Sequence, residues 1–227
     1  MGVIDTALPV RAAIFDCDGI LVDSERPWLD LMAFHLERLG ADRAAAESFR
    51  GLTAAEAVAR LDAVRTGTAP VPAVAEVDRA YSAALTAVSA PMPGAPELVR
   101  ALSGAVPIAV ASNGRRADVR GLLDRTGLLP HFDEVVTIDD VARGKPFPDI
   151  YEQAARALGL TPAAAVAFED SRVGSQAAHT AGCTVIGVNA DPSVALVSAV
   201  RLADLTQLRF DPATSTLHLD SRRSDDR

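Results

Sequence analysis

Near its N-terminus the chain reads Ala12-Ala13-Ile14-Phe15-Asp16-Cys17-Asp18-Gly19. The four apolar residues are typical of a buried parallel strand, and two aspartates follow where that strand ends. Open parallel sheets bind ligands beyond the carboxyl ends of their strands, and Gly19 permits a tight turn there. Two carboxylates one residue apart repel each other unless a proton or a cation lies between them. The stretch therefore predicts a strand followed by an acidic, metal-binding turn, with a plain polar turn as the alternative.

Apolar runs and helical patterns alternate through the second half of the chain. Short aliphatic runs predict further strands at residues 106–111, 134–137, 166–168 and 184–188. Apolar residues at helical spacing predict helices at residues 115–126, 149–158 and 173–181. Strands that alternate with helices are typical of a parallel sheet with crossover helices. We therefore predict an α/β fold with a Rossmann-like parallel sheet core and helices on both faces.

The pattern changes between residues 23 and 92, where Ala-rich helical stretches replace the strand-like runs. This change predicts an inserted α-helical cap domain after the first strand. We therefore expect a core from residues 1–22 and 93–211 and a cap from residues 23–92. Residues 212–227 are polar and poorly patterned, so we expect a flexible tail there.

Composition and charge narrow the class of protein. The chain has 227 residues, of which 49% are hydrophobic, enough to bury a core and a small accessory domain. Its formal net charge of -8 argues against nucleic-acid binding, and no apolar stretch reaches the roughly 20 residues that cross a bilayer. Two cysteines, Cys17 and Cys183, make no disulfide framework. We expect a cytoplasmic protein, a monomer or weak homodimer, with no nucleic-acid or membrane partner.

Three further groups of polar residues lie near the ends of predicted strands. Ser112 and Asn113 offer hydroxyl and amide groups that could hold phosphate oxygens, or could simply cap a helix. Lys145 lies in a loop stiffened by two prolines, where a fixed ammonium could neutralise a carboxylate and a phosphoryl group; a solvated lysine is the alternative. Glu169 and Asp170 add the oxygen ligands that octahedral Mg²⁺ prefers. Together with the acidic pair Asp16 and Asp18, these groups supply what phosphoryl transfer through an aspartyl intermediate requires.

The order of these motifs resembles the haloacid dehalogenase-like hydrolase superfamily, in particular its capped phosphatases and β-phosphoglucomutase-like members. The resemblance covers nearly everything before residue 212, and its motifs are residues 16–25, 112–114, 145–146 and 169–171. It implies an Mg²⁺-dependent phosphatase, a phosphoric monoester hydrolase acting through an aspartyl phosphate. The implied partner is a small phosphorylated metabolite, either a sugar phosphate or a phosphoglycolate-like acid.

The resemblance also implies a role for each acidic residue. Asp16 is the expected nucleophile that attacks phosphorus and becomes an aspartyl phosphate. Asp18 is the expected general acid and base, and its main-chain carbonyl also binds the metal. Asp170, supported by Glu169, is expected to complete the Mg²⁺ site with Asp16 and Asp18.

The remaining residues are expected to contact the substrate. Ser112 and Lys145 would hold the transferring phosphoryl group, with Asn113 backing them, and Lys145 is counted among the catalytic residues. Arg50 lies in a stretch that resembles the cap loop facing the active site in relatives that act on sugar phosphates or phosphoglycolate. It could bind a second anionic or hydroxyl group, or it could be a solvent-exposed arginine between helices.

Three other functions stay open. A phosphomutase of the β-phosphoglucomutase kind shares the acid pair and the cap, but such enzymes carry a histidine at the hinge where this chain reads Ser24-Glu25-Arg26-Pro27-Trp28. A 2-haloacid dehalogenase shares the Ser112-Asn113 pattern but lacks the second acid, since halide leaves without protonation. A non-catalytic binding module would not need the intact acid set. We therefore expect water to be the final phosphoryl acceptor, which favours a phosphatase.

Overall fold

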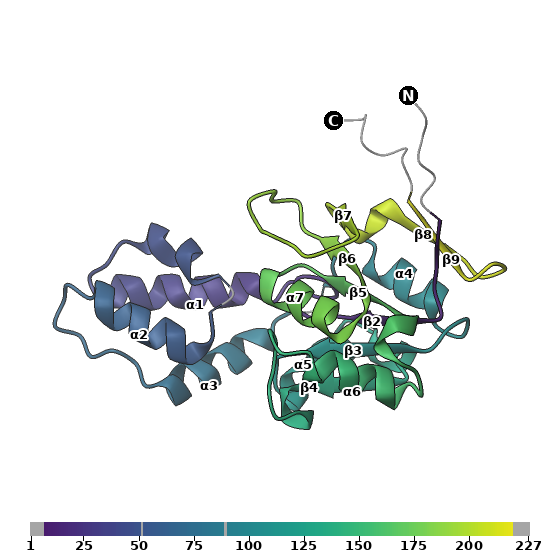
Figure 1. Ribbon diagram of the computed structural model, residues 1–227. Coiled ribbons are helices and arrows are strands. Elements are labelled where there is room, and N and C mark those ends of the chain that lie inside the picture. The colour runs from purple at the N-terminus through teal and green to yellow at the C-terminus, as the bar shows by residue number, and fades with distance from the viewer. Residues whose placement is uncertain (1–6, 51, 89, 220–227) are drawn as a thin grey trace. The chain divides into compact units, whose positions relative to one another are not determined.

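The computed structural model describes residues 7–50, 52–88 and 90–219 (Figure 1). The chain divides into two compact units. The first, here called the core unit, comprises Met1–Val22 and Ala90–Arg227, and the second, here called the helical unit, comprises Asp23–Ser89. Residues 90–92, which we expected in the cap, belong to the core unit because Met92 N donates a hydrogen bond to Leu21 O at 2.9 Å.

The core unit contains a six-stranded parallel sheet of order β4-β3-β2-β5-β6-β7. Its strands are β2 (Ala12–Phe15), β3 (Ile108–Ser112), β4 (Glu134–Thr137), β5 (Ala165–Glu169), β6 (Thr184–Val188) and β7 (Val200–Leu202). The Rossmann-like α/β prediction is confirmed, and the five predicted strands lie within two residues of their expected bounds. Strand β7 was not predicted because its three residues are too few to show a pattern. The acidic strand β2 lies near the middle of the sheet, between β3 and β5.

Four helices connect the strands: α4 (Ala95–Leu102), α5 (Arg116–Arg125), α6 (Asp149–Ala157) and α7 (Arg172–Ala181). Short 3₁₀ helices complete the connections: η2 (Leu129–His131), η3 (Ile138–Asp140), η4 (Pro162–Ala164) and η5 (Leu205–Gln207). The chain moves from β2 through β3 to β4 and then returns to β5 on the other side of β2. Because crossovers between parallel strands are right-handed, this order places α4 and α5 on one face and α6 and α7 on the other.

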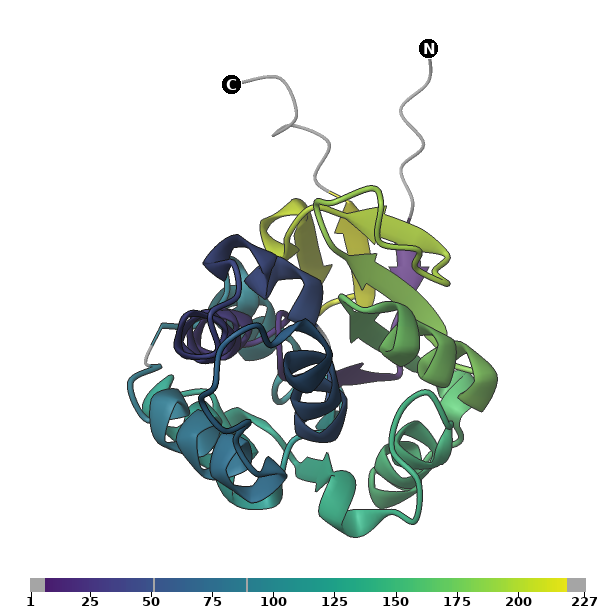
Figure 2. The same cartoon turned by 90° about the vertical axis from the view of Figure 1, so that its left-hand side faces the viewer.

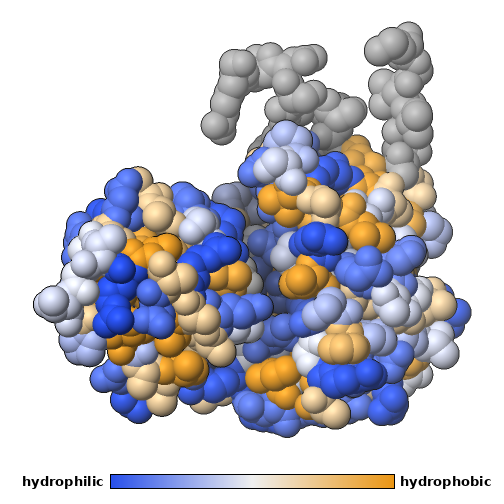
Figure 3. All heavy atoms as spheres, turned by 60° about the vertical axis from the view of Figure 1, so that its left-hand side comes forward, coloured by the Kyte–Doolittle hydropathy of each residue, from blue (hydrophilic) through white to orange (hydrophobic). Residues whose placement is uncertain are grey.

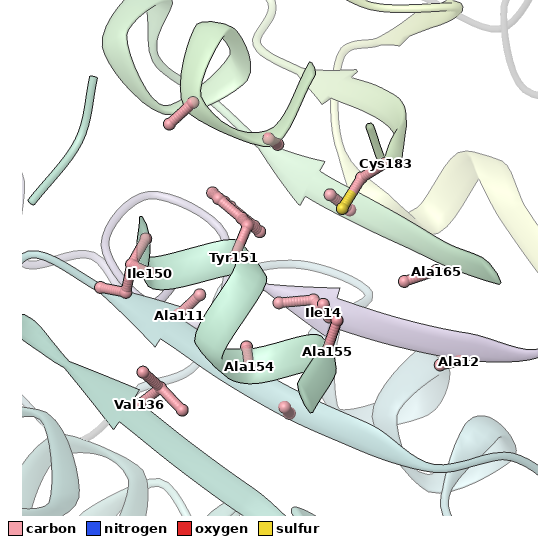
Figure 4. Close-up of a cluster of buried hydrophobic side chains, with 14 of the residues drawn as sticks. Ala12, Ile14, Ala111, Val136, Ile150, Tyr151, Ala154, Ala155, Ala165 and Cys183 are labelled. Carbon is pink, nitrogen blue, oxygen red and sulfur yellow. The ribbon is translucent and has the colours of Figure 1, made fainter. Parts of the chain in front are cut away.

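The face beneath α6 and α7 is built from small and aliphatic side chains, shown in Figure 4. Ile14 of β2 lies in this layer together with Tyr151 of α6, and both are fully buried. Successive residues of a strand point to opposite faces, so Phe15 faces the other way, where its ring stacks on Phe168 at 4.5 Å between centroids. The same alternation, continued one residue further, directs Asp16 to the α6 side of the sheet.

A second, three-stranded antiparallel sheet joins both ends of the described chain. It has the order β1-β9-β8 and consists of β1 (Ala7–Pro9), β8 (Leu208–Asp211) and β9 (Thr216–Leu219). Figure 2 shows β1, in purple, beside the yellow strands. The expected flexible tail was therefore wrong for residues 212–219, because Leu217 is buried and β9 pairs with both neighbours. Residues 220–227 lie outside the described residues.

The helical unit consists of α1 (Glu25–Arg38), η1 (Arg43–Phe49), α2 (Ala54–Val64) and α3 (Val74–Leu85). Thr53 and Glu56 form a capping box that satisfies the first N–H groups of α2. Trp28 packs in the apolar cluster of this unit, and its indole N–H donates to Phe49 O at 2.9 Å. Trp28 is therefore a packing residue of the helical unit.

The described surface carries hydrophilic and hydrophobic residues side by side on the face that Figure 3 shows. Within residues 7–50, 52–88 and 90–219, none of the helices combines the length and the apolar character that crossing a membrane requires.

His35 of α1 is a buried polar residue with unusual surroundings. The residue is only 6% exposed, and neither ring nitrogen has a hydrogen-bond partner among the described residues. The Phe34 ring lies edge-on to it at 5.4 Å. Burial lowers the pKa of His35, the charge of Arg38 lowers it further, and Glu76 opposes the change. The folded protein therefore holds the neutral imidazole more strongly than the unfolded chain does.

We expect the free energy of unfolding to decrease as the pH falls below about 6.5, the ordinary pKa of histidine, because the unfolded chain takes up the proton first. His35→Leu should lose less stability over this range and, at about pH 8, should be more stable by about 1 kcal/mol. Urea unfolding at about pH 8 and about pH 5.5 measures both effects. His179→Leu, at an exposed helix position, is the matched control. An unchanged pH dependence in His35→Leu would contradict the assignment.

Candidate active site

The turn after β2 carries the acidic pair against the end of β5. Asp16 N donates to Phe168 O at 3.0 Å, so the sheet pairing extends to the first aspartate. Gly19 then adopts a left-handed conformation with φ of 75°, and its N–H donates to Val22 O at 2.8 Å. A Cβ at Gly19 would lie 2.1 Å from Asp170 Oδ2. Glycine at this position therefore lets the Asp170 carboxylate pack directly against the acidic turn.

Lys145 connects two of these acidic strand ends. It is the only lysine among the 22 Lys and Arg residues of the chain, and its side chain is 4% exposed. Its Nζ donates to Asp16 Oδ1 at 2.7 Å and to Glu169 Oε1 at 2.6 Å. Burial alone would lower the pKa of Lys145, but the charges of Asp16 and Glu169 raise it above its ordinary value. The ammonium therefore stays charged and joins the ends of β2 and β5.

Glu169 is fully buried and receives donors at both carboxylate oxygens. Tyr151 Oη donates to Oε1 at 2.6 Å, and Ser171 Oγ donates to Oε2 at 3.2 Å. Burial raises the pKa of Tyr151 well above its usual range, and the charge of Glu169 adds to this, so the phenol keeps the proton that it donates. A Cβ at Gly174 would lie 2.0 Å from Oε1, which shows how closely the carboxylate packs on the first turn of α7.

Asp18 and Ser112 are also brought together. Ser112 is fully buried at the end of β3, and its Oγ donates to Asp18 Oδ2 at 3.2 Å. The same Oγ accepts a hydrogen bond from Gly114 N at 3.0 Å. Helix α5 has Arg115 as its N-cap and no side-chain cap bond, so helix capping does not account for Ser112 or Asn113.

Asn113 lies beside Lys145 in a different way from the one we expected. Its Nδ2 donates to Lys145 O at 3.2 Å, and its Oδ1 accepts from Lys145 N at 2.8 Å. The sequence favoured Asn113 as a group behind the phosphate contacts. The structure places its amide on the main chain of the lysine loop.

The carboxylates form a cluster suited to a cation. Asp16, Glu169 and Asp170 each place one oxygen within 4.8 Å of the others. Burial raises the pKa of Asp16 well above its usual range, Lys145 opposes this, and the charges of Glu169, Asp18 and Asp170 raise it further. Four carboxyl groups, those of Asp16, Asp18, Glu169 and Asp170, thus lie around a single ammonium at the carboxyl edge of the sheet. An oxygen-rich cluster of this kind fits a hard divalent cation.

Cys17, between the two aspartates, is a packing residue. It is fully buried. Burial raises the pKa of its thiol well above the ordinary value, and the charges of Asp18 and Asp16 raise it further. A thiol that keeps its proton is a poor nucleophile.

Arg50 belongs to the helical unit, directly after η1. Its guanidinium pairs with Glu47 at 2.9 Å and with Glu25 at 3.9 Å, and its side chain is 52% exposed. These ion pairs lie within the helical unit. Its predicted contact with a substrate stays a prediction.

Two residues that contact the site were not assigned to it from the sequence. The sequence pattern indicates Tyr151 only as part of a helix, although it is the sixth residue after Lys145 and lies on the buried face of α6. Asn189 directly follows β6, and its Nδ2 donates to Asp170 O at 2.9 Å. Like the residues of the other motifs, Asn189 is a polar residue at the carboxyl end of a parallel strand, where ligands bind.

A family model described as haloacid dehalogenase-like hydrolase matches residues 10–182. The chain belongs to the haloacid dehalogenase-like hydrolase family. The resemblance based on the four motifs is thereby confirmed.

Relatives of known activity indicate the class of reaction. The hydrolase is 35% identical over 206 residues to validoxylamine A 7'-phosphate phosphatase from Streptomyces hygroscopicus subsp. limoneus, covering 88% of this chain and 96% of the relative. It is 33% identical over 199 residues to hexitol phosphatase A from Escherichia coli (strain K12), covering 85% and 89%. The solved structure of CbbY from Rhodobacter sphaeroides in complex with phosphate superposes with a TM-score of 0.73 at 27% identity, covering 87% of this chain and 96% of that one. This hydrolase is a phosphoric monoester hydrolase, a phosphatase of phosphorylated metabolites.

The two tyrosines of the chain give a matched test of the Glu169 contact. Tyr151 donates to a buried carboxylate, whereas Tyr81 donates to the neutral carbonyl of Ser24 at 3.1 Å. Hydrogen bonds to charged groups contribute more to stability than neutral ones do. We therefore expect Tyr151→Phe to lower the free energy of unfolding by about 2 kcal/mol and Tyr81→Phe by about 1 kcal/mol. Urea denaturation measures both, and equal losses would contradict a charged partner for Tyr151.

Proposed function

We propose that this hydrolase is an Mg²⁺-dependent phosphatase that cleaves a small phosphorylated metabolite through an aspartyl-phosphate intermediate. The observation that carries the proposal is the contact of Lys145 Nζ with Asp16 Oδ1 at 2.7 Å inside the acidic cluster. A carboxylate next to a fixed ammonium, at the carboxyl end of a parallel strand, is suited to attack a bound phosphoryl group.

The donor set supports Mg²⁺ as the cofactor. Asp16 and Asp170 offer carboxylate oxygens, the main-chain carbonyl of Asp18 is the further ligand that the family resemblance implies, and Glu169 supports the cluster beside them. Bound there, the ion would offset the negative charge of the phosphoryl oxygens and favour the ionised form of Asp16.

The chain's own residues then divide the reaction into two steps. In the first, an Asp16 oxygen bonds to phosphorus, the bond to the ester oxygen breaks, and Asp18 protonates the leaving alkoxide. In the second, Asp18 takes a proton from water, the water oxygen bonds to phosphorus, and Asp16 is released together with inorganic phosphate. Lys145 and Ser112 hold the phosphoryl oxygens in both steps, and the Ser112 hydroxyl also orients Asp18.

The proposed substrate is a sugar or polyol phosphate first and a phosphoglycolate-like acid second. The relative named hexitol phosphatase A favours a hydroxylated ester. Arg50 of the helical unit, with its half-exposed guanidinium, is the proposed contact for a second anionic or hydroxyl group. The proposed setting is a reducing cytoplasm, compatible with two buried free thiols, and the proposed state is a monomer or weak homodimer.

Asp16→Asn should abolish phosphate release from a panel of p-nitrophenyl phosphate, hexitol phosphates, sugar phosphates and phosphoglycolate. We expect a loss of at least about a thousand-fold in kcat, because an amide cannot act as the nucleophile. The wild-type activity should disappear with EDTA and return with Mg²⁺. Asp62→Asn, on the surface of α2, is the control that should retain activity. Turnover in Asp16→Asn at the wild-type rate would remove the nucleophile assignment.

Asp18→Asn should separate the two steps. We expect a loss of about 10²–10⁴-fold in steady-state kcat. The p-nitrophenolate group needs little protonation to leave, so the first step with p-nitrophenyl phosphate should be less affected than hydrolysis of the intermediate. Quenched-flow measurement should then show a burst of p-nitrophenol up to the enzyme concentration. Normal steady-state turnover would rule out the acid and base role.

The phosphomutase alternative is tested with β-glucose 1-phosphate and a catalytic trace of bisphosphate. A phosphatase should release inorganic phosphate without an initial rise of glucose 6-phosphate. Glucose 6-phosphate formed faster than inorganic phosphate would reverse the choice between the two functions.

A further inference from the structure

The chain contains two asparagines, Asn113 and Asn189. Each uses its side-chain amide to bind the main chain of a loop that supplies a residue of the site. Asn113 binds the main chain of Lys145, and Asn189 binds the main chain of Asp170. The two contacts lie at different strand ends and involve different loops, so they can be tested independently.

Asn113 engages both polar groups of Lys145's main chain. Its amide donates to the carbonyl at 3.2 Å and accepts from the N–H at 2.8 Å, across 32 positions of sequence. A Cβ at Gly144 would lie 2.5 Å from Asn113 Oδ1, so the loop approaches this closely because residue 144 has no side chain. Lys145 is thus held at its main chain by Asn113 and at its ammonium by Asp16 and Glu169.

Asn189 makes hydrogen bonds with its main chain and its side-chain oxygen in addition to its contact with Asp170. Its N–H donates to Leu202 O at 2.8 Å, and its carbonyl accepts from Arg201 Nε at 3.1 Å, both on β7. Its Oδ1 accepts from Asp191 N at 2.9 Å, which leaves Nδ2 directed to Asp170 O at 2.9 Å. The edge strand β7 is thereby connected to the loop that carries the Asp170 carboxylate.

We propose that both asparagines are positioning residues, Asn113 for the ammonium of Lys145 and Asn189 for the carboxylate of Asp170. The catalytic consequence rests on the proposed function, since it requires that these two groups act on a phosphoryl group and a cation. A lysine side chain has many rotamers, and a displacement of about 1 Å of a reacting group can cost about 10²-fold in rate. Fixing the main chain of each residue reduces that freedom without any contact to the substrate.

The position of Lys145 can be measured without turnover, because it is the only lysine of the chain. An amine-specific acetylating reagent modifies Lys145 and the α-amino group, and peptide mass spectrometry reads the two separately. In the wild type Lys145 should react slowly, since it is buried and its pKa is raised. We expect Asn113→Ala to increase the acetylation rate of Lys145 by about ten-fold, through local opening of its loop, and to lower kcat. Asn189→Ala should leave that rate within about two-fold of the wild type.

Asn113→Asp keeps the acceptor for Lys145 N–H and loses the donor to its carbonyl. Lys145 of this variant should be acetylated at a rate between those of the wild type and Asn113→Ala. If Asn113→Ala does not fold, Asn113→Asp replaces it in the experiment. A loss of kcat in either variant with unchanged acetylation would mean that Asn113 acts on the substrate directly and would overturn the proposal. Unchanged kcat together with unchanged acetylation would overturn it as well.

The Asn189 assignment is tested by isothermal titration with MgCl₂ and no substrate. Outer-sphere partners of metal ligands typically affect affinity by about 10–100-fold, so we expect the Kd of Asn189→Ala to rise by about ten-fold. Asn113→Ala should not weaken Mg²⁺ binding. Asn189→Asp keeps the bond to Asp191 and loses the donor to Asp170, so it should bind as weakly as Asn189→Ala. Wild-type affinity for Mg²⁺ in either Asn189 variant would show that Asn189 stabilises only its own loop and does not position Asp170.

These measurements separate the inference from the proposed function. Acetylation and Mg²⁺ titration need no phosphatase activity, so the expected shifts without phosphate release from any ester would leave the positioning roles standing and refute the function. Mg²⁺-dependent phosphate release, with no change in the acetylation rate of Lys145 or in the Kd for Mg²⁺, would support the proposed function and refute the positioning roles.

Discussion

The site depends on one buried interaction, the ammonium of Lys145 between the carboxylates of Asp16 and Glu169. Charges removed from water are costly unless each has partners in good geometry, and here every member is bound by at least one other. Tyr151 and Ser171 occupy the remaining positions on Glu169. The arrangement joins β2, β5 and α6 at the edge where ligands of parallel sheets bind, so the same contacts that organise the fold also arrange the reactive groups.

Under the proposed function, the carboxyl groups around this ammonium would let an acidic protein bind an anionic ester by way of a cation. Asp16, Glu169 and Asp170 lie close enough to hold a divalent cation, and a bound cation together with Lys145 would present a positive face to phosphate. The carboxylates of the site also pack closely against the main chain. Gly19 and Gly174 allow Asp170 and Glu169 to approach main chain at distances that any Cβ would prevent.

Local patterns in the sequence predicted the central strands, the acidic turn and the lysine loop, because each signal lies within a few adjacent residues. The contacts that Tyr151, Asn189 and β9 make with distant segments escaped prediction. The roles of Tyr151 and Asn189 depend on which buried face of a helix or which strand end meets Glu169 and Asp170, and a single sequence does not give that register. Strand β9 was missed for the same reason, since its partner β1 lies some 200 residues earlier.

The pairing of β1 with β9 has a consequence for engineering the chain. Ala7 is the register partner of His218, so the two ends of the described chain lie next to each other in an antiparallel ladder. A short peptide could bridge them, and new termini could then be opened in a surface loop to give a circular permutant with the sheet intact. Deleting the first nine residues would instead uncover the β9 edge, whose unpaired N–H and C=O groups would invite intermolecular strand addition.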